Sequence, residues 1–194
     1  MVNDRRFSDL QGFLSQLDGD RDLRVVEAPV RAHLEVAEIH RRVIAAGGPA
    51  LLFNQVEGSD FPLATNLFGT ARRAEMAFGT RPGELVKRAV EFARESMPPD
   101  LGSLWGARDL LAAGLRLGTR TVRSGPVCEV QEGEVDLSRL PVITSWPEDG
   151  GPFFTLPLVY TEDPETDVHN LGIYRMQVHD GRTTGMHWQI GKGG

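Results

Sequence analysis

Hydrophobic residues in the first part of the chain follow helix-like and strand-like patterns in turn. Apolar side chains between residues 10 and 17 recur at the spacing of one helical face, and Ser8, followed three residues later by a glutamine, predicts a capping box. Leu23–Val26 predicts a short strand, and Ala50–Phe53 is a short apolar run typical of a buried strand. A helical pattern from about His33 to Ala46 separates them. This order predicts a βαβ unit, and therefore an α/β layer.

The pattern changes twice further along the chain. Residues 66–117 are mainly helical in pattern, with helices expected at 71–78, 82–95 and 103–117. From residue 119 onward, short β-prone runs alternate with glycine, proline and aspartate, and the candidate strands are 127–130, 155–160, 171–178 and 183–190. We therefore expect a boundary near residue 120, with an α/β domain over 1–120 and a β-rich domain over 121–194.

The last two candidate strands are joined by Asp180-Gly181, the favoured pair for a two-residue type I′ turn. Such a turn pairs residues whose numbers add up to 361: Tyr174 with His187, Arg175 with Met186, Ile173 with Trp188, Gly172 with Gln189 and Asn170 with Gly191. Opposed residues share a face, so Asn170 and Tyr174 lie on one side and Arg175 on the other. One pocket can use both Asn170 and Arg175 only if a bulge or twist intervenes, and Gly172 is a suitable position.

Composition narrows the class of protein. The chain has 194 residues, 40% of them hydrophobic and 25% charged, which is typical of a soluble globular protein. No apolar run approaches the ~20 residues of a membrane span, and the first residues lack the apolar core of a signal peptide. Cys128 is the single cysteine, which excludes an intrachain disulfide and a thiolate metal cluster. We expect a cytoplasmic protein.

The net charge of −6 comes entirely from the β-rich part, where residues 121–194 hold 5 basic and 11 acidic side chains. Neither part carries a basic stripe, which argues against a nucleic-acid partner. A phosphate bound in the acidic part would need a metal ion or the few available cations, among them Arg175 and Lys192. The glycine-rich pieces GGP and PEDGGP fit no phosphate-binding fingerprint, and we interpret them as loops.

Four further segments are informative together: GGPALLF, the stretch from Phe61-Pro62 to Gly69, the stretch from Leu140-Pro141 to Pro152, and NLGIYR at 170–175. In the same order, they resemble the UbiD family of reversible decarboxylases, which use prenylated flavin mononucleotide (prenylated FMN). The resemblance covers nearly the whole chain. It implies an α+β protein, in which an N-terminal α/β domain precedes the first strands of a flavin-reductase-like split β-barrel.

The resemblance also implies roles for individual residues. Asn170 would help bind a divalent metal, usually Mn²⁺, that holds the cofactor phosphate, with K⁺ as a further candidate ion. Arg175 would orient the substrate carboxylate and the proton-transfer network, and it would line the flavin together with Ile173 and Tyr174. Further cofactor contacts are expected on the returning strand, at His187, Trp188, Gln189, Lys192 and Gly193. A flavin prenyltransferase would supply the cofactor, and the protein would be a homo-oligomer.

Two positions depart from the family pattern. Gly191 stands where the family has a metal-binding histidine, so Lys192 or a downstream histidine substitutes, or the metal site is altered; His187 is three to four residues early. In addition, no Glu or Asp within residues 1–194 matches the acidic residues that complete the metal site and supply the proton. We therefore expect the chain to be an N-terminal fragment that is inactive alone.

The resulting hypothesis is a decarboxylase that releases CO2 from a small aromatic or α,β-unsaturated carboxylic acid, or runs the reverse carboxylation. A non-catalytic flavin-binding module that dimerises is the first alternative. A structural or assembly protein whose metal binding is lost at Gly191 is the second. Decarboxylation by the complete chain would separate the enzyme from both alternatives. Flavin retained by the 194-residue chain alone would favour the binding module, and no bound flavin in any form would favour the structural protein.

Overall fold

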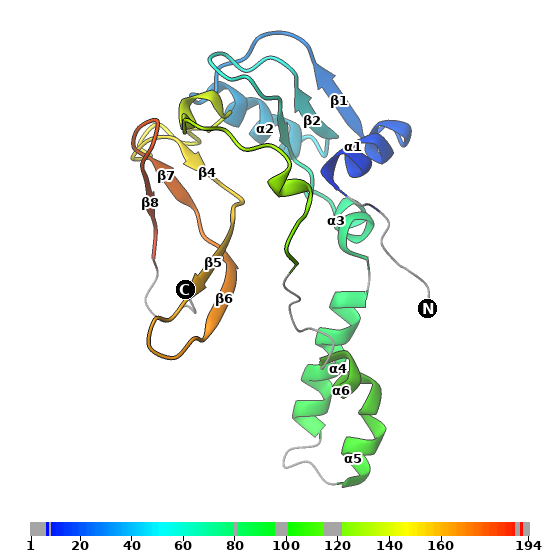
Figure 1. Cartoon of the computed structure of the whole chain (residues 1–194). Helices are drawn as coiled ribbons and strands as arrows, with labels where there is room; N and C mark the ends of the chain where they lie inside the picture. Colours follow the sequence, from blue (N-terminus) through cyan, green and yellow to red (C-terminus); the bar gives the residue numbers. More distant parts are fainter. Residues whose placement is uncertain are drawn as a thin grey trace. The chain divides into compact units, whose positions relative to one another are not determined.

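A computed structural model describes residues 7, 9–79, 81–95, 101–114, 122–188 and 191. These residues form two compact units (Figure 1). The larger unit combines Phe7–Gly69 with Gly133–Gly194, and the smaller one contains Thr70–Glu132. The larger unit therefore draws on sequence from both sides of residue 120. The mixture of helices with small sheets confirms the α+β class.

The predicted βαβ unit is present in the larger unit. Strands β1 (Leu23–Val26) and β2 (Ala50–Phe53) have the expected bounds and pair in parallel, and α2 (Glu35–Ala45) connects them. Strand β3 (Leu63–Thr65) adds to β2 in the antiparallel direction, so the strand order is β1-β2-β3. A parallel pair requires a crossover between its strands, which the amphipathic helix provides.

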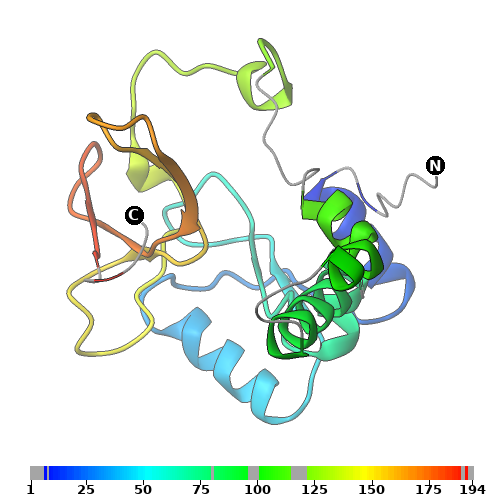
Figure 2. The same cartoon turned by 90° about the horizontal axis from the view of Figure 1, so that it is seen from below.

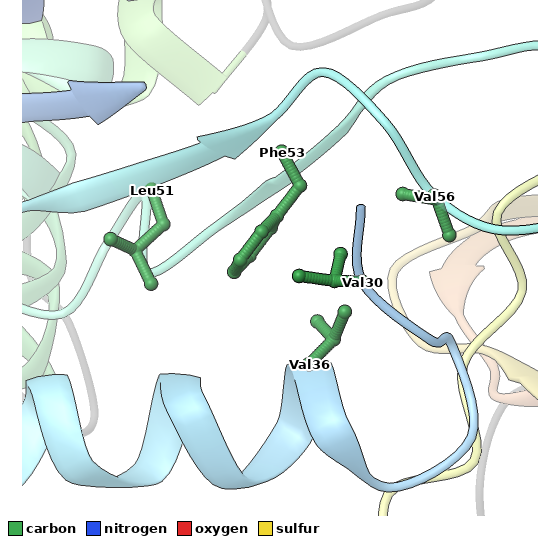
Figure 3. Close-up of a cluster of buried hydrophobic side chains, with 5 residues drawn as sticks. All are labelled: Val30, Val36, Leu51, Phe53 and Val56. Atoms are coloured by element: carbon green, nitrogen blue, oxygen red, sulfur yellow. The ribbon is translucent and has the colours of Figure 1, made fainter. Parts of the chain in front are cut away.

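The core of this unit lies between β2 and α2 (Figure 3). Leu51 and Phe53 alternate onto the face of β2 that meets the helix, where Val36 points toward them. The buried cluster is completed by Val30 and Val56 from the flanking loops. The apolar run Ala50–Phe53 therefore coincides with a strand because its side chains Leu51 and Phe53 are buried in the core.

Helix α1 (Leu10–Gly19) buries Phe13, Leu14 and Leu17, the apolar face predicted from their spacing. Its N-cap is Asp9, whose Oδ1 accepts a hydrogen bond from the backbone N of Gly12 at 2.8 Å. Ser8, the predicted cap, lies outside the described residues. An aspartate satisfies an orphan N–H of the first turn as well as a serine does, which explains why Asp9 serves as the cap.

The smaller unit is helical, with α3 (Ala71–Phe78), α4 (Arg81–Glu95), α5 (Leu101–Gly106) and α6 (Arg108–Gly114). Helix α6 contacts both α4 and α5, and the three helices form one group in both views (Figure 1, Figure 2). The prediction of a single helix at 103–117 is wrong, because the helix is interrupted between Gly106, the last residue of α5, and Arg108, the first residue of α6. Residues 115–117 are outside the described part. Glycine disfavours a helix interior. Arg88 then joins α4 to α6 through two hydrogen bonds to Asp109, at 2.7 and 2.9 Å.

The β-rich part of the larger unit contains two small sheets, and its described residues show no closed barrel. Strands β4 (Phe153–Phe154), β7 (Met176–Val178) and β8 (Thr184–Met186) form one sheet, in the order β4-β7-β8. Strands β5 (Leu158–Glu162) and β6 (His169–Ile173) form the other, an antiparallel pair. The strand expected over 171–178 is therefore divided between two sheets, with Tyr174 and Arg175 at the junction.

Two other strand predictions need correction. Residues 127–130 do not form a strand, since Pro126–Cys128 is a 3-10 helix with proline in its first turn, a position that proline favours. The strand expected at 155–160 begins later, because Thr155-Leu156-Pro157 separates β4 from β5. A second 3-10 helix, Leu137–Arg139, precedes the chain segment that pairs with the first half of the larger unit through the His33–Thr144 bridge.

The turn between β7 and β8 contains three residues, 180–182, instead of the predicted two. The backbone N of His179 donates to the carbonyl of Thr183 at 3.0 Å, which closes the loop. Asp180 stabilises it, because its carboxylate accepts hydrogen bonds from the backbone N–H groups of Arg182 and Thr183 and from the Thr183 hydroxyl. Met176 consequently pairs with Met186, so opposed residues add up to 362, one more than predicted.

Candidate functional site

The candidate site lies at the junction of β6 and β7, where the chain passes from one small sheet to the other. Asn170 Nδ2 donates a hydrogen bond to the Tyr174 hydroxyl at 2.9 Å. The rings of Tyr174 and Trp188 are 5.4 Å apart and tilted by 49°. Asn170, Tyr174 and Trp188 therefore form one continuous group of contacts, and two of its members offer aromatic surface.

The one-residue shift in register changes which predicted residues meet. His187 was expected to face Tyr174, but its backbone N donates to the carbonyl of Arg175 at 3.4 Å. Trp188 takes the place beside Tyr174. The additional residue in the turn causes this change of partners. In a β-ladder, a register shift by one residue moves each side chain of the shifted strand to the opposite face.

The predicted pairing of Asn170 with Gly191 is wrong for a different reason. Asn170 belongs to β6, which pairs with β5, and it lies opposite Thr161. Asn170 and Arg175 would face opposite sides only on one continuous strand. Because β6 ends at Ile173 and β7 begins at Met176, no such strand connects them, and the predicted separation onto two faces does not hold. The strand is interrupted at Tyr174, two residues after Gly172, where a bulge or twist was expected.

Arg175 is held by two residues of the preceding loop and strand. Its Nη1 and Nη2 donate to Oδ1 and Oδ2 of Asp149 at 3.1 and 2.7 Å, a bidentate pair. The guanidinium carbon lies 3.6 Å from the centroid of the Phe153 ring, within the range of a cation–π interaction. The Arg175 side chain is 37% exposed and that of Asp149 is 12% exposed, so the pair is accessible from the arginine side.

Asp149 and Phe153 are the residues of this site that the sequence analysis missed. Asp149 belongs to the PEDGGP segment, which we interpreted as a loop without a chemical role. The sequence offered one signal for Asp149, which is an acidic residue within the stretch from Leu140 to Pro152 that resembles the family. Arg175 lies 26 positions further along the chain, and no periodic pattern connects residues so far apart.

The pKa of the Asp149 carboxyl is lowered from its ordinary 3.8, mainly by the hydrogen bonds from the Arg175 side chain. The stabilising contribution of this contact is therefore fully present above the unfolded-state pKa and is lost as the pH falls through the lower, folded-state value. We expect the difference in urea midpoint between wild type and Asp149→Asn to be constant between about pH 5 and pH 8 and to shrink below about pH 4. A difference that stayed constant down to about pH 2 would contradict this assignment.

A cavity of about 950 Å³ lies in the same unit, between α2, β3 and residues 140–157. Its lining is mainly apolar and includes Phe153 and Thr155. None of the predicted site residues that the structure describes lines the cavity. The cavity nevertheless borders the Arg175 site, because Phe153 lines the cavity and also contacts the Arg175 guanidinium. Apolar walls suit the organic body of a ligand better than they suit a phosphate.

The described residues contain no group of three or more His, Cys, Asp or Glu side chains that could hold a metal ion. Asn170 can supply one oxygen ligand, because Tyr174 occupies its Nδ2 and leaves Oδ1 available. This part of the chain alone does not fit a divalent metal. Gln189, Lys192 and Gly193, three predicted cofactor contacts, lie outside the described residues.

Among the helices that the structure describes, none combines the length and apolar character needed to cross a membrane.

Solved structures with this fold include UbiD-class enzymes. The UbiD-class enzyme HmfF from Pelotomaculum thermopropionicum, in complex with FMN, is 26% identical with a TM-score of 0.68, over 93% of this chain and 37% of that chain. An evolved dimeric form of HmfF in complex with prenylated FMN is 24% identical with a TM-score of 0.62, over 95% of this chain and 39% of that one.

Sequence comparison leads to the family itself. The N-terminal domain of 3-octaprenyl-4-hydroxybenzoate carboxy-lyase (UbiD_N) matches residues 14–93, and the Rift-related domain of the same carboxy-lyase (UbiD) matches residues 120–194. A protein of Chlamydia pneumoniae that is named as one of the subunits of a 4-hydroxybenzoate decarboxylase is 48% identical over 185 residues, which are 95% of this chain and 31% of that protein. The chain belongs to the UbiD family. It spans about a third of the length of the curated relatives it matches first.

Proposed function

We propose that the full-length protein is a flavin-dependent decarboxylase, which removes CO2 from an aromatic or α,β-unsaturated carboxylic acid or catalyses the reverse carboxylation. The observation that carries the proposal is the oriented guanidinium of Arg175, on the segment that resembles the family's cofactor-binding strand. A guanidinium can bind a carboxylate through two parallel hydrogen bonds, which orients it as well as attracting it. The FMN bound to HmfF supports a flavin cofactor, and the decarboxylase name of the Chlamydia relative supports the reaction class.

The described residues fit the flat ring of a flavin better than its phosphate. Tyr174 and Trp188 present aromatic surface, and Trp188 is 51% exposed. When bound, a flavin supplies an electron sink for the charge that remains as CO2 leaves. We propose prenylated FMN as the cofactor, with a flavin prenyltransferase as its supplier. Ile173 and His187 complete the proposed contacts within the described part, and Gln189, Lys192 and Gly193 add to them beyond it.

In this proposal the residues of the chain bind and orient. Arg175 holds the substrate carboxylate, while Tyr174 lies beside the cofactor ring with its hydroxyl fixed by Asn170. The Oδ1 atom of Asn170 would supply one ligand to a divalent metal, proposed to be Mn²⁺, and the described residues offer no group of His, Cys, Asp or Glu that could complete such a site. The protein is proposed to act as a homo-oligomer.

The test uses full-length protein produced together with a flavin prenyltransferase. We expect flavin absorbance, a cofactor mass equal to that of prenylated FMN, and CO2 release from 4-hydroxybenzoate or another carboxylic acid of a small aromatic and α,β-unsaturated panel. Flavin without turnover on any panel member would favour the non-catalytic binding module. The absence of both flavin and turnover would overturn the proposal.

A further inference from the structure

We propose that Asp149 is a positioning residue, which binds one end of the Arg175 guanidinium and leaves the Nε edge for the substrate carboxylate. This role rests on the proposed function, because it assumes that Arg175 binds the carboxylate of the substrate. It concerns a residue outside the NLGIYR segment and divides the hydrogen-bond donors of Arg175 between two acceptors.

Asp149 is itself fixed by its own turn. Its backbone N donates to the carbonyl of Trp146 at 3.1 Å, and its Oδ2 accepts from the backbone N of Trp146 at 3.2 Å. The next residue is anchored as well, since Gln177 Nε2 donates to the carbonyl of Gly150 at 2.5 Å. The carboxylate is therefore held in place by contacts that do not depend on Arg175.

Arg175 receives its orientation from this fixed carboxylate. Two hydrogen bonds to Asp149 set the direction of the guanidinium plane, and the Phe153 ring at 3.6 Å supports it. Phe153 is placed by β4, which pairs with β7 immediately after Arg175. A long, flexible side chain is thereby restricted to one position.

The Arg175–Asp149 pair leaves two adjacent hydrogen-bond donors of the guanidinium unused. A guanidinium has five N–H donors, and Asp149 accepts one from Nη1 and one from Nη2. The Nε–H group, which has no partner among the described residues, and the remaining hydrogen of Nη2 point along the adjacent edge. These two donors match the spacing of a second carboxylate, so Arg175 can bind Asp149 and a substrate at the same time.

Asp149 has opposite effects on how strongly Arg175 attracts the substrate carboxylate and on how precisely Arg175 orients it. The negative charge of Asp149 reduces the attraction of Arg175 for another carboxylate, whereas its geometry sets where that carboxylate lies. Losing Asp149 should therefore impair kcat much more than KM. A displacement of the reacting group by about 1 Å can cost about 100-fold in rate.

The experiment compares flavin-loaded full-length wild type with Asp149→Asn, on a carboxylic acid that the wild type decarboxylates. We expect kcat per bound flavin to fall about 10- to 100-fold, with KM within about threefold of wild type. Glu148→Gln removes the same charge from the neighbouring residue, which has no hydrogen bond in the described structure, and should leave both constants unchanged. Normalisation to flavin separates positioning from folding, since a purely structural defect lowers the amount of loaded enzyme and not kcat per flavin.

A kcat per flavin within twofold of wild type, or an equal loss in Glu148→Gln, would overturn the role of Asp149. If Asp149→Asn does not accumulate as folded protein, Asp149→Glu replaces it. That variant keeps the charge but shifts the carboxylate by one methylene, and kcat should fall about tenfold. An inactive wild type would instead overturn the proposed function, so the two failures are distinguishable.

Discussion

Replacement of Arg175 by lysine is expected to lower kcat/KM for decarboxylation about 100-fold in the flavin-loaded full-length protein. Lysine keeps the positive charge but has no planar fork, so it cannot bind Asp149 and a substrate carboxylate with parallel pairs of hydrogen bonds. It also loses the stacking on Phe153 that orients the guanidinium. Steady-state rates of CO2 release, normalised to bound flavin, measure the effect.

Arg182→Lys is the matched control for this change. Arg182 is exposed in the turn between β7 and β8, and in the described structure only its backbone N takes part in a hydrogen bond. Its replacement should leave kcat/KM within about twofold, because charge and hydration are preserved. If Arg175→Lys behaved like this control, Arg175 would not be the carboxylate-binding residue.

Truncation of Phe53 to alanine should destabilise the larger unit by about 3–5 kcal/mol. Phe53 is fully buried, with 0% of its surface exposed, and it packs against Val36 and Val30 (Figure 3). Removal of the ring leaves a cavity that the rigid β2–α2 contact can close only in part. The free energy of unfolding in urea, followed by circular dichroism, measures the loss.

Phe61→Ala serves as the control, because Phe61 is 44% exposed and its truncation should cost less than about 1 kcal/mol. Phe53→Leu provides a milder variant in case the alanine protein does not fold. A cost below about 1 kcal/mol for Phe53→Ala would mean that the β2–α2 contact is not the core of the unit.

The regular elements near the N-terminus were predictable because their signals are local. Leu23–Val26 is a short β-prone segment between Asp22 and Glu27, Ala50–Phe53 is an apolar run that follows Gly47-Gly48-Pro49, and both are strands with the expected bounds. The helical spacing between them gives α2. In such a layer each element must bury its own apolar side chains, so the pattern along the chain and the packing in space carry the same information.

The hairpin shows where local signals become ambiguous. The Asp180-Gly181 pair suits a two-residue turn, but the same aspartate also stabilises the observed three-residue turn through Thr183. The choice between the turns moves every opposed pair by one residue. It therefore decides that Trp188, and not His187, lies beside Tyr174.

By itself, the sequence determined the α+β class, the βαβ unit and the family, and it predicted the segment around Asn170 and Arg175 as the candidate site. The tertiary structure alone decided that this segment leaves one sheet for another at Tyr174 and that Asp149 and Phe153 hold the guanidinium. The physical reason is the distance along the chain over which each kind of interaction acts. Hydrophobic periodicity and turn chemistry act over a few residues, whereas an ion pair between positions 26 apart forms only when the loop and both sheets are in place.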